Sequence, residues 1–288
     1  MLTRIDRIQL LVPDRAKVAE RWSALLGAET DRQDTIPHLS AHRTAMRLGS
    51  GWVELLEPDG AGPAATALSR RGAHLYAAGA ATPDIDGLLS RFAARGQATV
   101  VENDQIHLAP EQPGLDGLRV VISADADLPA VGDIDFLYEV TFLTGSATGS
   151  TDQITDLFGL DRSNFVDIAS DTYGYSGVLT RFRAGKLDRF EVITPNDPAK
   201  TLGRFHARIG NGFYMAFAES GCLPLIEQRA LARGDGLTTK PATATHDGQP
   251  IDSLFLHPDT LGGMMLGVSR RTQAWSWSGH PEWVEEAR

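Results

Sequence analysis

The sequence predicts an α+β protein made of four βαβββ modules, which pair into two cup-shaped, eight-stranded mixed sheets with the helices outside. The first observation is an order of one strand, one helix and about three strands that recurs along the chain. The second is an apolar strand with a central glutamate at residues 51–58, whose pattern returns at residues 190–195, so that Glu191 follows Glu54 by 137 positions. The third is a shared Ala-Arg-Gly ending of two helical stretches, at Gly96 and Gly234.

Apolar spacing delimits the elements of the first two modules. Residues 5–12 have the composition of a strand, and Pro13-Asp14 opens a helix that Gly27 ends. The remaining elements expected in the first half are strands at 38–48, 51–58, 73–81, 98–102, 105–108 and 117–123, and a helix between Thr82 and Gly96.

The second half repeats this scheme. Its predicted elements are a strand at 135–144, a helix at 150–159, a hairpin at 178–193, a strand at 212–218, a helix at 223–233 and a closing stretch at 254–268. Residues 124–133 are polar, contain Pro and Gly and lack periodicity, which is typical of a domain boundary. We therefore expect domains at 1–127 and 133–270, and a tail at 271–288. The tail's tryptophans suggest that it docks on the body or on a partner: Trp275, Trp277 and Trp283.

Composition excludes several classes of partner and cofactor. The net charge is -10 and no basic patch offsets it, which argues against nucleic acid and anionic membranes. No signal peptide and no apolar run of about 20 residues is recognisable, so we expect a cytoplasmic protein. Cys222 is the only cysteine, which excludes an intrachain disulfide and a multi-cysteine metal site. Because no glycine-rich phosphate loop is present, neither a nucleotide nor a flavin is expected.

Four stretches carry a family resemblance: residues 5–14 (IDRIQLLVPD), 52–60 (WVELLEPDG), 72–96 (GAHLYAAGAATPDIDGLLSRFAARG) and 254–267 (LFLHPDTLGGMMLG). They resemble the vicinal oxygen chelate superfamily, which includes glyoxalase I, methylmalonyl-CoA epimerase, bleomycin- and fosfomycin-resistance proteins and extradiol dioxygenases. The resemblance extends over most of residues 3–270. It implies a small-molecule ligand and, as in other paired-module members, a homodimer. It does not imply one reaction, because the superfamily hosts many chemistries.

The resemblance also implies where a metal would lie. Metal-dependent members hold a divalent ion on four strand positions of a cup, usually His or Gln, Glu or Gln, His, and Glu. These positions become Arg7, Glu54, His74 and about Val121 in the first cup, and about Tyr138, Glu191, Tyr214 and Gly267 in the second. The first set keeps two ligands, Glu54 and His74, and Arg7 would place a permanent positive charge beside them. We therefore expect a divalent metal, if any, only in the first cup. An extradiol dioxygenase is not expected, because neither cup supplies the His, His, carboxylate triad that iron needs.

The side chains expected on the cup faces form the candidate site. Glu54 and His74 would act as general base and acid, and Arg7 would stabilise developing negative charge. The alternative is that Arg7 simply neutralises Glu54. Substrate contacts are expected from Gln9, Trp52 and Tyr76 in the first cup and from Tyr138, Glu191 and Tyr214 in the second.

Two functions remain open at the level of the sequence. The first is an enzyme, a lyase or isomerase, acting on a small carbonyl-containing molecule. The second is a non-catalytic protein that sequesters a small molecule, which the degenerate ligand sets favour. His38 and His42 are expected near the mouth of the first cup, where loops bring substrate contacts, whereas His107 is not expected to be catalytic.

Overall fold

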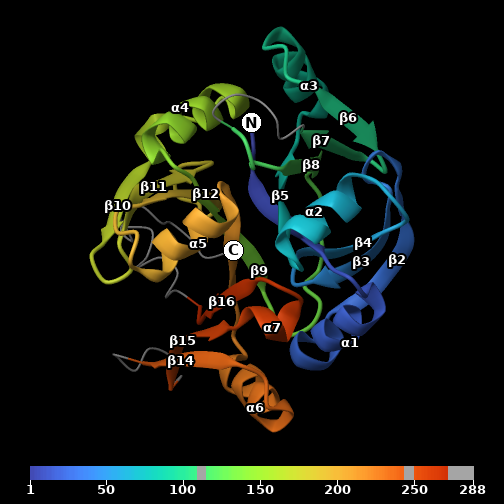
Figure 1. Cartoon of the computed structure of the whole chain (residues 1–288), viewed down its shortest axis with the longest axis vertical. Coiled ribbons are helices and arrows are strands. Elements are labelled where there is room, and N and C mark those ends of the chain that lie inside the picture. Colours follow the sequence, from blue (N-terminus) through green and yellow to red (C-terminus); the bar gives the residue numbers. More distant parts are fainter. Residues whose placement is uncertain (109–114, 243–249, 272–288) are drawn as a thin grey trace.

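The computed structural model describes residues 1–108, 115–242 and 250–271, and these residues form two eight-stranded sheets. The predicted α+β class with two cup-shaped mixed sheets is therefore confirmed. Figure 1 shows the two curled sheets next to each other, one built from each half of the chain. The tryptophans of the expected tail lie outside the described residues.

The first sheet comes from the N-terminal half. Its strands are β1 (Arg4–Leu11), β2 (Glu29–Ile36), β3 (Ala41–Leu48), β4 (Gly51–Pro58), β5 (His74–Thr82), β6 (Thr99–Glu102), β7 (Gln105–Leu108) and β8 (Val120–Ala124). They lie in the order β2-β3-β4-β1-β5-β8-β7-β6. β1 is parallel to β4 and antiparallel to β5, and β5 is parallel to β8. The two modules of this half therefore meet along β1 and β5.

The second sheet repeats this topology. Its strands are β9 (Phe136–Leu143), β10 (Val166–Ser170), β11 (Tyr175–Arg181), β12 (Arg189–Pro195), β13 (Gly212–Glu219), β14 (Leu237–Pro241), β15 (Ile251–Leu256) and β16 (Met265–Ser269). Their order, β10-β11-β12-β9-β13-β16-β15-β14, matches that of the first sheet strand for strand. The internal repeat seen in the sequence is thus a repeat of topology.

Helices connect the strands. They are α1 (Arg15–Leu26), α2 (Pro63–Arg71), α3 (Ile85–Ala94), α4 (Ala147–Phe158), α5 (Thr201–Ile209), α6 (Leu223–Arg233) and α7 (Pro258–Leu261), with 3-10 turns η1 (Pro37–Leu39) and η2 (Arg162–Asn164). α1, α3, α4 and α6 each follow the first strand of a module, as predicted, and lie at the periphery in Figure 1. The Asp14 carboxylate caps α1 by accepting from the Lys17 amide, and Gly27 ends it with a φ of 70°.

The sequence did not predict α2 and α5. Residues 59–71 read as a linker because of their Gly, Pro and Ala content, yet Pro63 occupies the first turn of α2, where a proline is tolerated. The two helices occupy equivalent places, after the last strand of the first and third modules. Each packs on the concave side of a sheet: Ala64 of α2 lies in a cluster with Leu56 and Tyr76, and Leu202 of α5 with Ile193. They therefore cover the two cups.

A β-bulge shapes the floor of the first cup. The pairing of β1 with β5 is irregular around Asp6, so that Asp6 and Arg7, although consecutive, contact each other through their side chains. The neighbouring strand leaves room for Arg7, because a Cβ on Gly79 would lie 1.8 Å from the Arg7 Cγ. The same irregularity recurs in β9 around Tyr138.

The edges of the first sheet approach each other. The Asn103 side chain donates to the Thr35 carbonyl at 2.7 Å, and His38 Nδ1 lies 2.5 Å from the Glu102 carboxylate. These contacts join the β6–β7 turn to the end of β2 and the start of η1. The sheet is thus curled far enough for its first and last strands to be linked by side chains.

One apolar core runs behind both sheets and includes residues of α1, α3, α4 and α6. Trp22 Nε1 donates to the Leu261 carbonyl at 3.1 Å, and the rings of Phe92 and Phe158 pack edge to face, so α1 and α3 each contact the other half of the chain. Residues 125–135 connect the sheets, and the domain boundary expected there stays a prediction.

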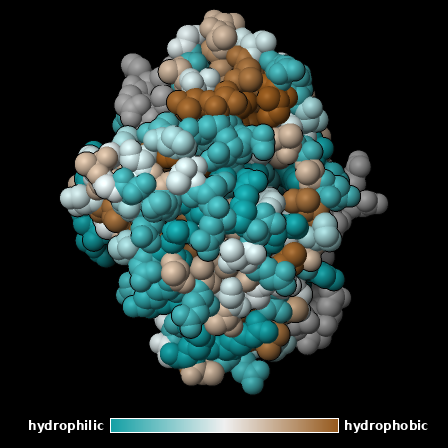
Figure 2. Space-filling view, turned by 90° about the vertical axis from the view of Figure 1, so that its right-hand side faces the viewer, coloured by the Kyte–Doolittle hydropathy of each residue, from teal (hydrophilic) through white to brown (hydrophobic). Residues whose placement is uncertain are grey.

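The surface is mostly hydrophilic on the face drawn in Figure 2, with a hydrophobic patch near its top, at the height of α3 and β6. Val100 and Val101 of β6 are exposed. Within the described residues, no helix is long and apolar enough to span a membrane.

Gly79→Ala tests whether the Arg7 side chain needs the space above Gly79, where it crosses β5. The added methyl group would displace the buried Arg7 side chain, and we expect a loss of about 1–3 kcal/mol in the free energy of unfolding, measured by urea denaturation. Gly145→Ala is the matched control, because its Cβ would meet no atom closer than 3.8 Å. Equal stability of the two variants would contradict this account of the floor.

Candidate functional site

The floor of the first cup is organised around the Glu54 carboxylate on β4, which is fully buried. Four side-chain donors reach its two oxygens: Arg7 Nη1 at 2.7 Å, Arg43 Nη1 at 3.2 Å and Gln105 Nε2 at 2.7 Å on one oxygen, and Gln9 Nε2 at 2.8 Å on the other. The register explains the contact with Gln9, because Gln9 on β1 lies directly beside Glu54. The expected ion pair of Arg7 with Glu54 is therefore present.

Two further carboxylates balance the two arginines. Asp6 accepts from Arg7 at 2.7 Å, and Asp34 on β2 accepts from Arg43 at 2.5 Å. Burial alone would raise the pKa of Glu54, but the charges of Arg7 and Arg43 and the amide hydrogen bonds lower it to about 2. Glu54 is thus a permanent anion, and both of its oxygens are occupied.

This arrangement does not fit a metal at the four family positions. Two guanidinium groups already hold Glu54, and a cation added there would meet their positive charge. The strand register also separates the expected ligands, because His74 pairs with Leu11 at the end of β1, whereas Ala77 and Gly79 lie beside Gln9 and Arg7. The sequence placed His74 beside Glu54 because it could not show the bulge between these pairs.

His74 instead lies in the wall of a pocket. It is 9% exposed, and its Nδ1 lies 2.7 Å from the Gly72 carbonyl oxygen, an acceptor, so the proton belongs on Nδ1. The other ring nitrogen, Nε2, is buried and has no hydrogen-bond partner within the described residues. Burial, followed by the charges of Arg71 and Arg119, lowers the pKa of His74 to about 4, although the hydrogen bond to Gly72 acts in the opposite direction.

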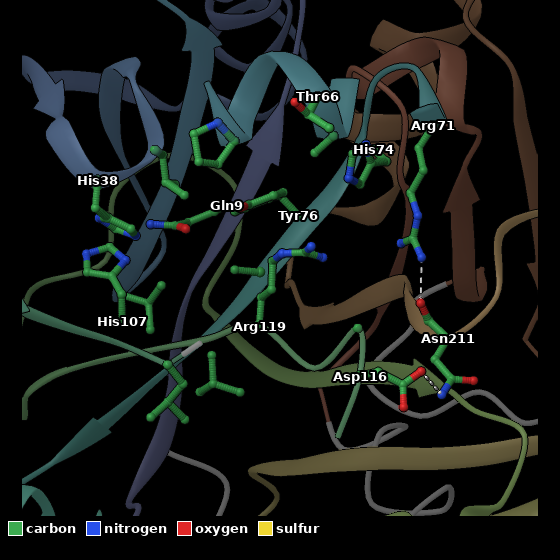
Figure 3. A pocket seen from close by; sticks show the side chains of 18 of the residues that line it. Gln9, His38, Thr66, Arg71, His74, Tyr76, His107, Asp116, Arg119 and Asn211 are labelled. Atoms are coloured by element: carbon green, nitrogen blue, oxygen red, sulfur yellow. Dashed lines mark hydrogen bonds between the residues drawn. The ribbon is translucent and has the colours of Figure 1, made fainter. Parts of the chain in front are cut away.

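The pocket has a volume of about 690 Å³ and lies between the concave face of the first sheet and α2, closed on one side by residues 209–211 after α5. Figure 3 shows two different ends. Arg71, His74, Asp116 and Asn211 lie at one end, and His38 and His107 at the other, with Gln9 and Arg119 between them. Of the expected substrate contacts, Gln9 and Tyr76 line this pocket and Trp52 does not. Trp52 stacks instead against Arg47, at 5.0 Å.

Positive charge gathers at the first of these ends and extends from there to Arg119 in the middle of the pocket. Arg70, Arg71 and Arg119 line the pocket, and none of the three has a carboxylate ion pair within the described residues. Arg71 donates to the carbonyls of Ile209 and Asn211, and the Arg119 guanidinium lies 4.7 Å from the Tyr76 ring. Burial, then the charges of Arg119 and Arg70, lower the pKa of Arg71 to about 10. This end is therefore electropositive.

The second cup has a different floor. Glu139, not Tyr138, occupies the register position of Arg7, and it forms a buried ion pair with Arg189 at 2.5 Å. The bulge at Tyr138 shifts the alternation of β9 by one residue, which the sequence pattern did not reveal. Glu191 accepts from Thr141, and burial and then the charge of Glu139 raise its pKa.

The expected trio of the second cup is not assembled as one polar floor. Tyr138 is fully buried, with its hydroxyl 3.5 Å from Ser269 Oγ, and Tyr214 packs edge to face on Phe205 of α5. Neither phenol is a hydrogen-bond partner of Glu191 in the described contacts. Tyr214 lines a second pocket together with Arg71 and His74, two residues that also line the pocket of the first cup.

Sequence reasoning missed several residues of the first cup. Arg43 and Gln105 complete the shell of Glu54, and Arg71 and Arg119 make the electropositive part of the pocket. His107, which was not expected to be catalytic, lines the pocket at its other end. The alternation within 105–108 could have placed Gln105 and His107 on one face. Arg119 lies directly before β8, and Arg71 lies in a helix that was not predicted.

Glu54→Gln tests the role of the buried carboxylate. Two arginines would lose their shared counter-ion, so we expect a loss of about 3–5 kcal/mol in the free energy of unfolding at neutral pH. The folded pKa of about 2 lies below the ordinary value of 4.5, so this stabilisation is present above pH 4.5 and is lost as the pH falls toward 2.

Urea denaturation at several pH values measures both effects, with Glu20→Gln, an exposed residue of α1, as the control. A Glu54→Gln protein as stable as the wild type would contradict the assignment of Glu54 as a charged anchor.

Comparisons with known proteins agree with this fold. Residues 4–116 match the model of the Glyoxalase/Bleomycin resistance protein/Dioxygenase superfamily. A mutant of 4-hydroxymandelate synthase from Streptomyces coelicolor superposes with a TM-score of 0.71 at 14% identity, covering 93% of this chain and 92% of that chain. A xylose isomerase-like TIM barrel/4-hydroxyphenylpyruvate dioxygenase fusion protein gives a TM-score of 0.62 at 11% identity, covering 94% of this chain and 49% of that chain. No curated protein matches the sequence.

Identities this low establish the fold and not the reaction. One of the similar structures is a dioxygenase fusion protein. The expectation that this protein is not an extradiol dioxygenase therefore stays a prediction. The matched segment contains β1 to β7 with the buried Glu54, and the second half repeats the same strand order. Residues 4–116 therefore match the glyoxalase, bleomycin resistance protein and dioxygenase superfamily, and the likeness of the whole chain to the solved structures is one of fold.

Proposed function

We propose that the protein is an enzyme of the lyase or isomerase type, which binds a small anionic molecule with a carbonyl group in the pocket of the first cup. The observation that carries this proposal is the electropositive end of the pocket, where arginines without a carboxylate partner among the described residues surround a neutral histidine. Guanidinium groups in such a site bind carboxylate or phosphate groups, so the site suits an anionic ligand.

The charge of the pocket contrasts with that of the whole chain. The protein carries a net charge of -10, yet Arg70, Arg71 and Arg119 line one cavity. Asp116 also lines the pocket, and its carboxylate accepts from the Asn211 side chain at 2.9 Å. The Arg119 Nε is buried without a hydrogen-bond partner among the described residues, and a carboxylate or phosphate oxygen would satisfy it.

His74 is the proton-transfer group in this proposal. The hydrogen bond to Gly72 leaves the lone pair on Nε2, and the lowered pKa keeps the ring neutral near pH 7. A neutral imidazole beside two guanidinium groups can remove a proton from a carbon next to a carbonyl, while Arg71 or Arg119 stabilises the enolate oxygen. Return of the proton to a different carbon or face gives an isomerase. Expulsion of a leaving group from the β carbon gives a lyase.

Glu54 has a positioning role in this proposal. Its two oxygens are occupied by four donors, so it is not available to accept a proton from a ligand. It orients Gln9, whose Oε1 is buried without a partner among the described residues and which lines the pocket. Arg7 likewise donates its hydrogen bonds to Asp6 and Glu54 and is not the ligand-binding arginine in this proposal.

Sequestration of a small molecule is the second candidate. The pocket wall also includes the apolar side chains of Leu39, Ala77 and Val121, which suit a binding protein as well as an enzyme. The two candidates differ in one respect: a sequestering protein binds the anion without exchanging its protons.

Arg119→Met tests the anion site, because it keeps the stem above the Tyr76 ring and removes the charge. With pyruvate and oxalate as probes, we expect the dissociation constant from isothermal titration calorimetry to rise about tenfold, the loss of roughly 1.4 kcal/mol. Arg32→Met is the control, because Arg32 lies near Trp52 and outside the pocket wall. Equal affinities of the wild type and Arg119→Met would contradict the anion site.

His74→Gln tests proton transfer. Solvent deuterium exchange at the methyl group of bound pyruvate, followed by NMR, should slow about 10²- to 10⁴-fold in this variant while binding changes little. In the wild type, exchange should decline at acidic pH, where protonation of His74 removes the base; the pKa of His74 is about 4 in the ligand-free protein. His257→Gln, in a residue that does not line the pocket, should leave exchange unchanged. Binding of pyruvate without exchange in the wild type would favour sequestration.

A further inference from the structure

Three potential metal ligands meet at the other end of the pocket. His38 comes from η1, Glu102 from the end of β6 and His107 from β7, and one ligand atom of each lies within 4.8 Å of the others. His38 Nδ1 is 2.5 Å from the Glu102 carboxylate, and the two imidazole rings lie 4.5 Å apart. In Figure 3 the rings of His38 and His107 lie next to each other, near Gln9.

The buried member of this cluster has an unused nitrogen. His107 is 5% exposed, and its Nε2 has no hydrogen-bond partner within the described residues. A buried polar atom without a partner costs free energy, so it requires an explanation. His38 and Glu102 are only partly buried, which leaves a route to the cluster from the pocket.

We propose that His38, Glu102 and His107 form a divalent transition-metal site, at a place distinct from the four strand positions around Glu54. The set of two imidazoles and one carboxylate suits Zn²⁺, Co²⁺, Ni²⁺, Fe²⁺ or Mn²⁺ better than Ca²⁺ or Mg²⁺, which prefer oxygen ligands. Three protein ligands leave coordination positions open, and these face the pocket, because both histidines line it.

A purely structural role explains less of the geometry. His38 and Glu102 could act as a hydrogen-bonded clasp between the two edges of the first sheet, next to the contact of Asn103 with Thr35. That clasp does not involve His107, and it leaves the buried Nε2 without a partner. A metal ion would satisfy Nε2 and join η1 to β6 and β7. Metal binding should therefore also stabilise the closed sheet.

This proposal can be tested independently of the reaction proposed above, because metal binding is measured without substrate. The full chain, stripped with a chelator, is titrated with Zn²⁺ by calorimetry and with Co²⁺ by absorption spectroscopy. We expect one equivalent to bind, a visible Co²⁺ spectrum with imidazole ligation, and a rise in melting temperature. His107→Gln, His38→Gln and Glu102→Gln should each weaken binding by at least about tenfold.

His42→Gln is the matched control. His42 is also a histidine of the first half, but it is exposed near Asp59 and does not belong to the cluster, so its loss should leave the affinity unchanged. Circular dichroism checks that each variant folds, and the partly exposed His38 and Glu102 carry the test if the His107 variant does not. The absence of stoichiometric binding, or equal binding by the wild type and by every folded cluster variant, would overturn the proposal.

Discussion

The first cup depends on one buried carboxylate. Glu54 is fully buried, and its desolvation is offset only because four donors converge on it from β1, β3 and β7. Since Glu54 itself lies on β4, one charge ties together strands from both modules of the half. The polar floor is therefore a closed network, in which removing any member leaves a buried charge or amide without its partner.

Because this network engages the polar groups of the floor, the side chains with unpaired polar atoms lie in the walls of the cup. Arg7 is bound to Glu54 and Asp6. Among the described residues, two buried imidazole nitrogens of the pocket wall have no hydrogen-bond partner: Nε2 of His74 at one end and Nε2 of His107 at the other. The second cup has an analogous solution, in which Glu139 and Arg189 form the buried pair. Each cup thus has a buried ion pair in its floor, Arg7 with Glu54 in the first and Arg189 with Glu139 in the second.

Strand and helix periodicity predicted the fold and the orientation of Arg7, Gln9 and Glu54, because these residues follow the regular alternation of β1 and β4. It failed where regularity is broken. The register shifts between β1 and β5 after Gln9, and between β9 and β13 at Tyr138, change which residues face the cup, and no residue type marks them. Periodicity also missed α2, which contributes Arg70 and Arg71 to the pocket wall, because the Gly, Pro and Ala content of residues 59–71 is typical of a linker.

The electropositive end couples ligand binding to the basicity of His74. Arg71 and Arg119, after burial, hold the pKa of His74 down, and they do so while they have no anionic partner among the described residues. An anion bound between them would offset their charge, and the pKa of His74 would rise from about 4 toward its ordinary value of 6.5. A base with a higher pKa is a stronger proton acceptor, as long as it stays neutral. The arginines that would hold the ligand would therefore also set the strength of the base, and an anionic substrate would increase it on binding.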